Sequence, residues 1–281
     1  MQETPRQEPT YVLGASDAET QRLMLQADLY GRTTRRFLQD AGVTTGMRVL
    51  DVGSGAGDVA FLAAELVGPS GAVVGVDVNP AVLATAWARA QAERRDNLVF
   101  VEGDCRTAAL GSDFDAAIGR FVLMHTSNAS QTLRTIAARV RPGGIVAFAE
   151  GDFATALGYV RAGPTGLSRS LWEWTAELWR RLDLPIAMAP VLYRAFLEAG
   201  LGAPEMFLHA PLGCRDDWAG YSVDAQSVRS IVPLLERYGI TTAEVLQVDT
   251  LAERYHAEVV RTGIPFMLLP LVTACARTPA S

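Results

Sequence analysis

Three glycines at alternate positions mark the part of the chain best suited to chemistry. Residues 49–58 read VLDVGSGAGD, with glycines at Gly53, Gly55 and Gly57, and the apolar segment 59–67 follows at once. The pattern predicts a buried strand, a tight turn and a helix. Glycine lacks a Cβ, so the backbone can approach a ligand closely and adopt positive φ. The amides of the turn and the helix N-terminus then suit a polar or anionic group.

Carboxylates follow the next two apolar runs. Asp77 ends one of them, and a carboxylate there can accept two hydrogen bonds from a ribose diol. Its alternative role is that of a helix-entry acid ahead of Asn79. Further on, Glu102 and Asp104 flank one glycine, and we favour Asp104 as the acceptor for an exocyclic adenine amine. The alternative for Asp104 is a turn residue.

These residues need a parallel sheet to bring them together. Apolar runs separated by helical segments predict strands at 49–52, 72–76, 98–101, 114–118 and 145–149. Such a pattern indicates a parallel sheet with helices on both faces. Ligands bind beyond the carboxyl ends of the strands in these sheets. The polar residues at those ends form the candidate site: Asp51, Asp77, Asp104, Arg120 and Glu150.

The rest of the chain is predicted to frame this sheet. Residues 1–45 form an N-terminal helical segment that opens with a capping box at 16–19. Residues 46–281 form the main domain, in which 205–210 and 264–276 are further strands. Two helical insertions are expected in it, at about 151–190 and 215–255. Insertions of this kind either cover a site as a lid or merely extend the fold.

Composition narrows the class of protein. The chain has 281 residues, a hydrophobic fraction of 49% and a net charge of −6, and it lacks the basic stripe of a nucleic-acid-binding protein. Its three cysteines lack metal-ligand spacing, so no metal site is expected and a reducing cytoplasm fits. The apolar run 264–276 is interrupted by Pro270 and is too short to span a membrane. The polar N-terminus has no signal-peptide core.

Over about residues 45–150 the chain resembles the class I S-adenosylmethionine-dependent methyltransferases. Residues 49–57 are similar to that family's first motif, and residues 114–120 and 141–144 to its fourth strand and the turn before its fifth. The alternate glycines also depart from the G-x-G-x-x-G pattern of NAD-binding proteins. The resemblance implies S-adenosyl-L-methionine as cofactor, bound by Asp51, Gly53, Gly55, Gly57, Asp77, Val78, Asp104, Cys105 and Arg120.

A narrower resemblance points to the ubiquinone-biosynthesis-type and natural-product small-molecule methyltransferases. It implies an α/β, Rossmann-like fold, with a seven-stranded, mostly parallel sheet, a reversed last strand and helical lid insertions. The expected activity is methyl transfer to a phenol-, quinol- or polyketide-like molecule of secondary metabolism. The alternative is a protein that binds the cofactor but promotes a non-methylating reaction or serves as a binding module. The oligomeric state stays open, with a homodimer as one option.

Four residues are candidates for contact with the substrate. His125 follows the fourth strand and could act as a base, or it could be a packed imidazole. Asp152, just past the fifth strand, competes for the role of base. Tyr11 could face the sulfonium through a cation–π contact, or it could be a tail residue. Trp172 could line an apolar substrate pocket, and a packing stripe is its alternative.

Overall fold

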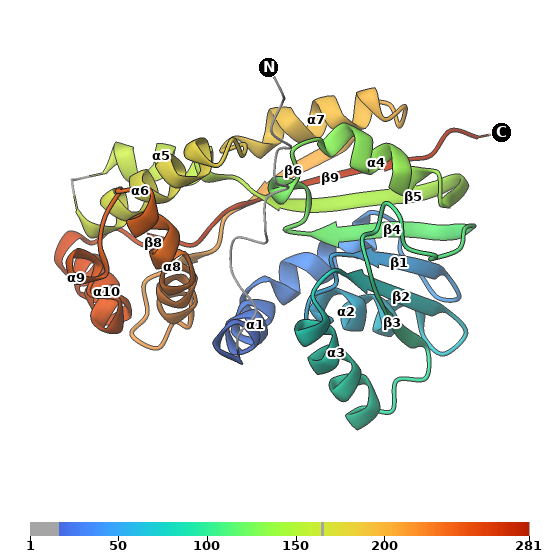
Figure 1. The fold of residues 1–281 in the computed structure, drawn as a ribbon, viewed down its shortest axis with the longest axis horizontal. Helices are drawn as coiled ribbons and strands as arrows, with labels where there is room; N and C mark the ends of the chain where they lie inside the picture. The colour runs from blue at the N-terminus through green and yellow to red at the C-terminus, as the bar shows by residue number, and fades with distance from the viewer. Residues whose placement is uncertain (1–16, 164–165, 281) are drawn as a thin grey trace, which may run out of the picture.

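The computed structural model describes residues 17–163 and 166–280 and contains a seven-stranded sheet of order β3-β2-β1-β4-β5-β9-β6 (Figure 1). Its strands are β1 (Arg48–Val52), β2 (Ala72–Asp77), β3 (Leu98–Glu102), β4 (Phe114–Arg120), β5 (Val140–Gly151), β6 (Glu205–His209) and β9 (Leu271–Arg277). Strands β1 to β5 pair in parallel, and β9 runs antiparallel to both β5 and β6. The predicted fold class is confirmed, including the reversed last strand.

Helices cover both faces of this sheet because its central strands are apolar on both sides. One buried cluster joins the sheet to α2 (Asp58–Val67) and α3 (Pro80–Ala92). The other joins it to α4 (Ala129–Ala137) and α7 (Met188–Glu198). The predicted entry to α3 is confirmed, since the Asn79 side chain accepts a hydrogen bond from the Ala81 N–H at 3.0 Å and Pro80 stands at the first helical position.

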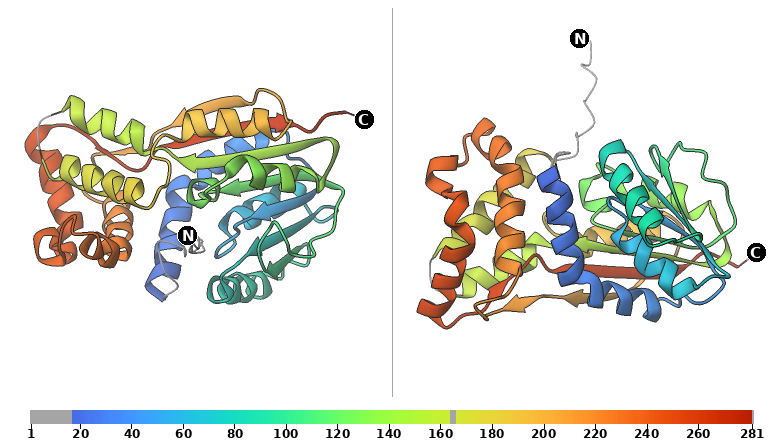
Figure 2. Two further views of the ribbon diagram at one scale, coloured as in Figure 1. Left: turned by 45° about the horizontal axis from the view of Figure 1, so that its top comes forward. Right: turned by 90° about the horizontal axis from the view of Figure 1, so that it is seen from below.

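Further helices stand beside the carboxyl end of the sheet, and we call them the lid (Figures 1 and 2). The lid comprises α5 (Phe153–Ala162), α6 (Leu167–Arg181), α8 (Gly220–Arg237), α9 (Ala243–Leu246) and α10 (Leu251–Thr262), with the 3₁₀ turn η2 (Val248–Thr250). Helix α1 (Asp17–Asp40) packs against both α2 and α8, so it lies between lid and sheet (Figure 2). None of the helices in the described part of the chain is long and apolar enough to cross a membrane.

The last predicted strand is divided in two. Residues 264–276 were expected to be continuous, but Pro270 separates β8 (Phe266–Met267) from β9. Proline has no N–H to donate to a sheet, which explains the break. Strand β8 pairs instead with β7 (Leu212–Gly213) at the base of the lid. The segment between β8 and β9 thereby becomes available to the site, and Leu268 and Leu269 line it.

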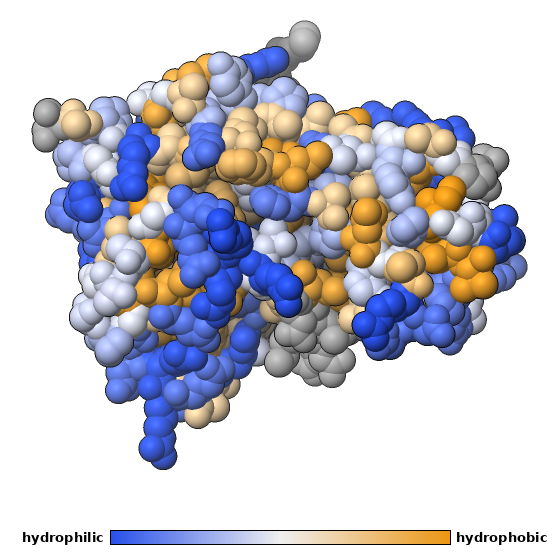
Figure 3. Space-filling model, turned by 180° about the vertical axis from the view of Figure 1, so that it is seen from behind, coloured by the Kyte–Doolittle hydropathy of each residue, from blue (hydrophilic) through white to orange (hydrophobic). Residues whose placement is uncertain are grey.

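The sheet ends in an apolar edge at β6. Phe207 and Leu208 on this strand are each 53% exposed, and Tyr193 and Leu197 of α7 are also exposed. Seen from behind, the molecule shows hydrophobic surface among its charged side chains over this edge (Figure 3). An edge strand with unpaired backbone groups can accept another strand.

Candidate active site between the sheet and the lid

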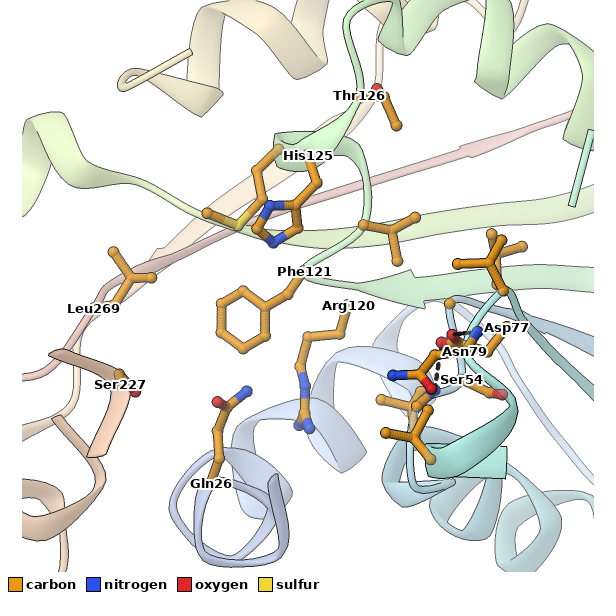
Figure 4. Close-up of a pocket in the computed structure, with 18 of the residues that line it drawn as sticks. Gln26, Ser54, Asp77, Asn79, Arg120, Phe121, His125, Thr126, Ser227 and Leu269 are labelled. Carbon is orange, nitrogen blue, oxygen red and sulfur yellow. Dashed lines mark hydrogen bonds between the residues drawn. The ribbon is translucent and has the colours of Figure 1, made fainter. Parts of the chain in front are cut away.

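A cavity of about 410 Å³ extends from the carboxyl end of the sheet into the lid. The glycine turn and the ends of β2, β3 and β4 line one side, and α1, α6 and α8 line the other. In Figure 4, Arg120, Phe121 and Gln26 meet between the strand end that bears Asp77 and the lid helix that bears Ser227. The cavity falls within the volume range of small-molecule sites.

Two of the three glycines of the turn line the cavity. Gly53 and Gly55 line it with φ of +65° and +52°. A Cβ on Gly53 would stand 2.7 Å from Val122 Cγ2, so no larger residue fits there without a shift. Gly57 caps α2 and does not line the cavity, and a Cβ there would lie 2.9 Å from Phe100. Packing, rather than contact with a ligand, explains Gly57.

Asp77 fulfils the helix-entry role and also faces the cavity. Its two carboxylate oxygens accept hydrogen bonds of 2.9 Å from the backbone N–H groups of Gly55 and Asn79. The side chain therefore ties the glycine turn to the start of α3. Burial raises the pKa of Asp77, while these N–H groups oppose the shift. Each carboxylate oxygen has a second lone pair, so Asp77 can still accept from a bound diol. Val78 beside it is exposed and lines the cavity.

Asp51 lies behind the turn and not in the cavity wall. It is only 1% exposed, and burial raises its pKa well above the ordinary value while the Arg120 guanidinium opposes the shift. Direct contact with a ligand, as the resemblance implied, does not follow from this position.

Asp104 and Cys105 line the cavity at the end of β3. The Asp104 carboxylate pairs with the Arg106 guanidinium, which lowers the pKa of Asp104 and keeps it ionised. Burial raises the pKa of Cys105 to about 11, so its thiol stays protonated near neutral pH. Cys105 therefore contributes to the wall of the cavity and not to nucleophilic chemistry.

Arg120 connects the end of β4 to α1. Its guanidinium donates a hydrogen bond of 2.9 Å to Thr34 Oγ1 and lies 5.9 Å from the centre of the Tyr30 ring. Tyr30 in turn donates to the Leu269 carbonyl at 2.7 Å. The sequence analysis placed Arg120 in the candidate site but did not place helix α1 there. The signal that could have done so is a polar face of α1 that is buried, formed by Gln26, Tyr30 and Thr34 at a spacing of four residues.

Glu150 anchors the turn that carries His125. Its carboxylate accepts hydrogen bonds of 3.0 to 3.3 Å from the backbone N–H groups of Val122, Leu123 and Met124. This fixes the 3₁₀ turn η1 (Leu123–His125), and His125 lines the cavity with its ring centre 6.3 Å from that of Trp179. Burial raises the pKa of Glu150 to about 7, although the three N–H groups favour its ionised form.

Replacing Glu150 by glutamine should change how stability depends on pH. The folded pKa of about 7 lies above the ordinary 4.5, so the wild type loses stability as pH rises from about 5 to 7. This loss is about 3 kcal/mol, and Glu150→Gln should lack it. Urea unfolding at about pH 5 and pH 8 measures the difference, with the exposed Glu205→Gln as control. Parallel pH profiles for the variant and wild type would contradict this role of the carboxyl group.

Asp152 is a structural residue, which corrects its expected role as a base. It caps α5 by accepting from the Thr155 N–H at 3.0 Å, and its other oxygen accepts from the Met188 N–H at 2.5 Å. The carboxylate is buried and is not part of the cavity wall. Its two oxygens accept backbone N–H groups at the junction of β5, α5 and α7, so the carboxylate stabilises this junction.

Aromatic side chains cover the lid side of the cavity. Trp172 and Trp179 of α6 both line it, and both pack against Phe153, with ring centres 5.9 Å and 4.8 Å apart. Trp172 is thus both a cavity residue and a packing residue. Trp174, two residues after Trp172 and therefore on about the opposite face of the helix, does not line the cavity. Tyr11 lies outside the described residues.

Sequence reasoning missed several residues of the cavity. Phe121 follows β4 with a φ of +60°, a strained conformation for a bulky residue, and it lines the cavity. Helix α8 adds the acid Asp224 and the hydroxyl of Ser227, although it was expected only to be helical and polar. Among the described residues there is no group of three or more His, Cys, Asp or Glu that could hold a metal ion.

Comparison with known proteins finds matches to part of the chain. The model of a family described as "Methyltransferase domain" matches residues 44–174. The ubiquinone/menaquinone biosynthesis C-methyltransferase of Nitrobacter hamburgensis is 33% identical over 145 residues, 48% of this chain and 57% of that protein. The enzyme of the same name from Ectopseudomonas oleovorans is 32% identical over 116 residues, 40% of this chain and 68% of that protein.

The chain spans about half the length of the curated relatives that it matches first. In structure, it resembles a putative methyltransferase from Bacillus halodurans, with a TM-score of 0.58, 17% identity, and coverage of 89% of this chain and 100% of that one. That likeness concerns the fold. The matched family region contains the glycine turn, Asp77 and Asp104, whereas α8 to α10 lie outside it.

Proposed function

The chain belongs to the class I S-adenosylmethionine-dependent methyltransferases, and we propose that it transfers the methyl group of this cofactor to a small, largely apolar molecule. The observation that carries the proposal is the continuity of the cavity. One end is formed by Gly53, Asp77 and Asp104, and the other by Trp172 and Asp224. A nucleoside end and a substrate end would thus share one cavity.

The residues at the sheet end fit the cofactor. Gly53 and Gly55 line the cavity without a side chain, so a ligand can approach the backbone of the turn closely. Ser54 Oγ is buried in the cavity wall and has no hydrogen-bond partner among the described residues, so a polar ligand atom would satisfy it. Asp77 would hold the ribose, Asp104 the adenine amine, and the glycine turn the amino-acid end.

When bound, the cofactor supplies a sulfonium methyl that is already a strong electrophile. The protein's task is therefore to align a nucleophile and exclude water. Glu150 fixes the turn that presents His125, and the aromatic lid residues keep the space apolar. We propose His125 as the group that would take up a proton where the nucleophile must lose one.

The lining supports a phenol-, quinol- or polyketide-like substrate. Trp172, Trp179, Phe121 and Phe153 form apolar walls suited to a flat or extended hydrocarbon frame. Curated relatives are named for ubiquinone and menaquinone biosynthesis, which agrees with a ring-bearing substrate. The proposal includes a role in secondary metabolism and a cytoplasmic location.

Incubation with methyl-labelled S-adenosylmethionine tests the proposal. A panel of naphthols, hydroquinones and polyketide-like phenols should yield at least one labelled product together with S-adenosylhomocysteine. NAD, by contrast, should not bind. Turnover of a panel compound that requires the cofactor but transfers no label would favour a non-methylating reaction instead. Cofactor binding without turnover of any compound would favour a binding module.

A further inference from the structure

Helix α8 places one carboxylate in the lid side of the cavity. Residues of one helical stripe on α8 line it: Val223, Asp224, Ser227, Val228 and Ile231. Asp224 is 8% exposed, and its neighbours on this stripe are mainly apolar. A buried acid in an apolar wall costs free energy unless it is compensated. The carboxyl group therefore needs hydrogen-bond partners in the folded protein.

We propose that Asp224 accepts a hydrogen bond from a hydroxyl group of the substrate and thereby selects molecules that carry a phenolic or enolic O–H. This deepens the proposed function and rests on it, since it names a feature that the methyl acceptor must have. Helix α8, which bears Asp224, lies outside residues 44–174, the region that the family model matches.

In the described part of the lid, Asp224 has one hydrogen-bond partner, Tyr255, which occupies only one of its two carboxylate oxygens. Tyr255, fully buried on α10, donates its hydroxyl to Asp224 Oδ2 at 2.5 Å. Among the described residues no hydrogen bond reaches Oδ1. Tyr255 thus fixes the orientation of the carboxyl group, and Oδ1 is the remaining acceptor. Burial raises the pKa of Asp224 to about 6, which suits a group that shares a proton with a hydroxyl.

The wall around Asp224 favours a neutral donor. Val223, Val228 and Ile231 line the same side of the cavity and offer no solvation to an ammonium group. A phenol provides a donor for Asp224 without bringing a second charged group into this apolar wall.

Two probes that differ by methylation of the hydroxyl oxygen test this contact without requiring turnover. Calorimetry with S-adenosylhomocysteine bound would compare 1-naphthol with 1-methoxynaphthalene. The wild type should bind 1-naphthol about 10-fold or more tightly, the effect of a hydrogen bond to a charged acceptor. Equal affinity for the two probes would overturn the proposal. Tighter binding of 1-naphthylmethylammonium than of 1-naphthol would overturn it in favour of a cation site.

The variant Asp224→Asn identifies the acceptor. Its amide oxygen can still accept from Tyr255, so the fold should persist, but its NH₂ group would face the substrate hydroxyl with a donor. The preference for 1-naphthol should fall below about 2-fold. Asp249→Asn alters an exposed acid of the same lid and should retain the preference. Retention in Asp224→Asn would overturn the proposal.

The same proteins separate this inference from the proposed function. If the wild type shows the preference but transfers no methyl group to any compound, the proposed function fails while the contact stands. If the wild type methylates a phenol and Asp224→Asn does so within about 2-fold, the function stands and the inference fails. The comparison of probes on the wild type needs no variant, so an unfolded Asp224→Asn would still leave a deciding measurement.

Discussion

Replacement of Trp172 by alanine is expected to cost about 3–5 kcal/mol of unfolding free energy, the usual cost of removing a buried tryptophan. The indole is only 6% exposed and meets the Phe153 ring edge-on at 5.9 Å. It also lines the cavity, so substrate binding or turnover should weaken by a further 1–3 kcal/mol, about 5- to 150-fold, in the protein that remains folded.

Thermal and urea unfolding would separate these two effects of Trp172→Ala. Trp174→Ala is the matched control, because this half-buried residue of the same helix packs outside the cavity. It should lower stability less and leave substrate binding unchanged. Affinity for S-adenosylhomocysteine should change little in either variant, because the proposed cofactor contacts lie at the strand ends. Full activity of Trp172→Ala at unchanged stability would contradict both assigned roles.

The sheet could be predicted because its signals are local. Strands β1 to β5 are apolar on both faces, and the glycine turn has a conformational need that a short stretch reveals: positive φ at Gly53 and Gly55. The start of α3 is equally local, since Asn79 caps the helix within two residues. Ligands bind beyond the carboxyl ends of parallel strands, and on this basis Asp77, Asp104 and Arg120 could be assigned to the cavity that they line.

The lid side of the site depends on contacts distant in sequence. The orientation of the Asp224 carboxyl group depends on a hydrogen bond from Tyr255 on another helix, and the sequence spacing of the two residues does not predict this contact. The two acids at the end of β5 could not be assigned from the sequence either. Glu150 and Asp152 both stand at a strand end, yet backbone N–H groups of η1 and α7 take up their carboxylates. Bonds to the backbone alone do not separate these acids from Asp77, whose two oxygens also accept N–H groups; the difference is that Asp77 lines the cavity and Glu150 and Asp152 do not.

Asp77→Ala should weaken the binding of S-adenosylmethionine and S-adenosylhomocysteine by about 10- to 150-fold, or 1.5–3 kcal/mol. Two charge-assisted hydrogen bonds to the ribose diol would be lost. The structure adds a second cause, because the Asp77 carboxylate also accepts from the N–H groups of Gly55 and Asn79. Without it the glycine turn loses its tie to α3, so the pocket is also less well ordered.

A ligand without a ribose diol distinguishes the two causes. Calorimetry with S-adenosylhomocysteine and with its 2′,3′-dideoxy analogue would give the energy of the diol contact in the wild type. In Asp77→Ala the difference between these ligands should disappear, while loosening of the turn would weaken both equally. Asp96→Ala, an exposed acid after α3, should leave both affinities unchanged. Unchanged affinity of Asp77→Ala for S-adenosylhomocysteine would remove Asp77 from the cofactor site and restrict it to holding the turn.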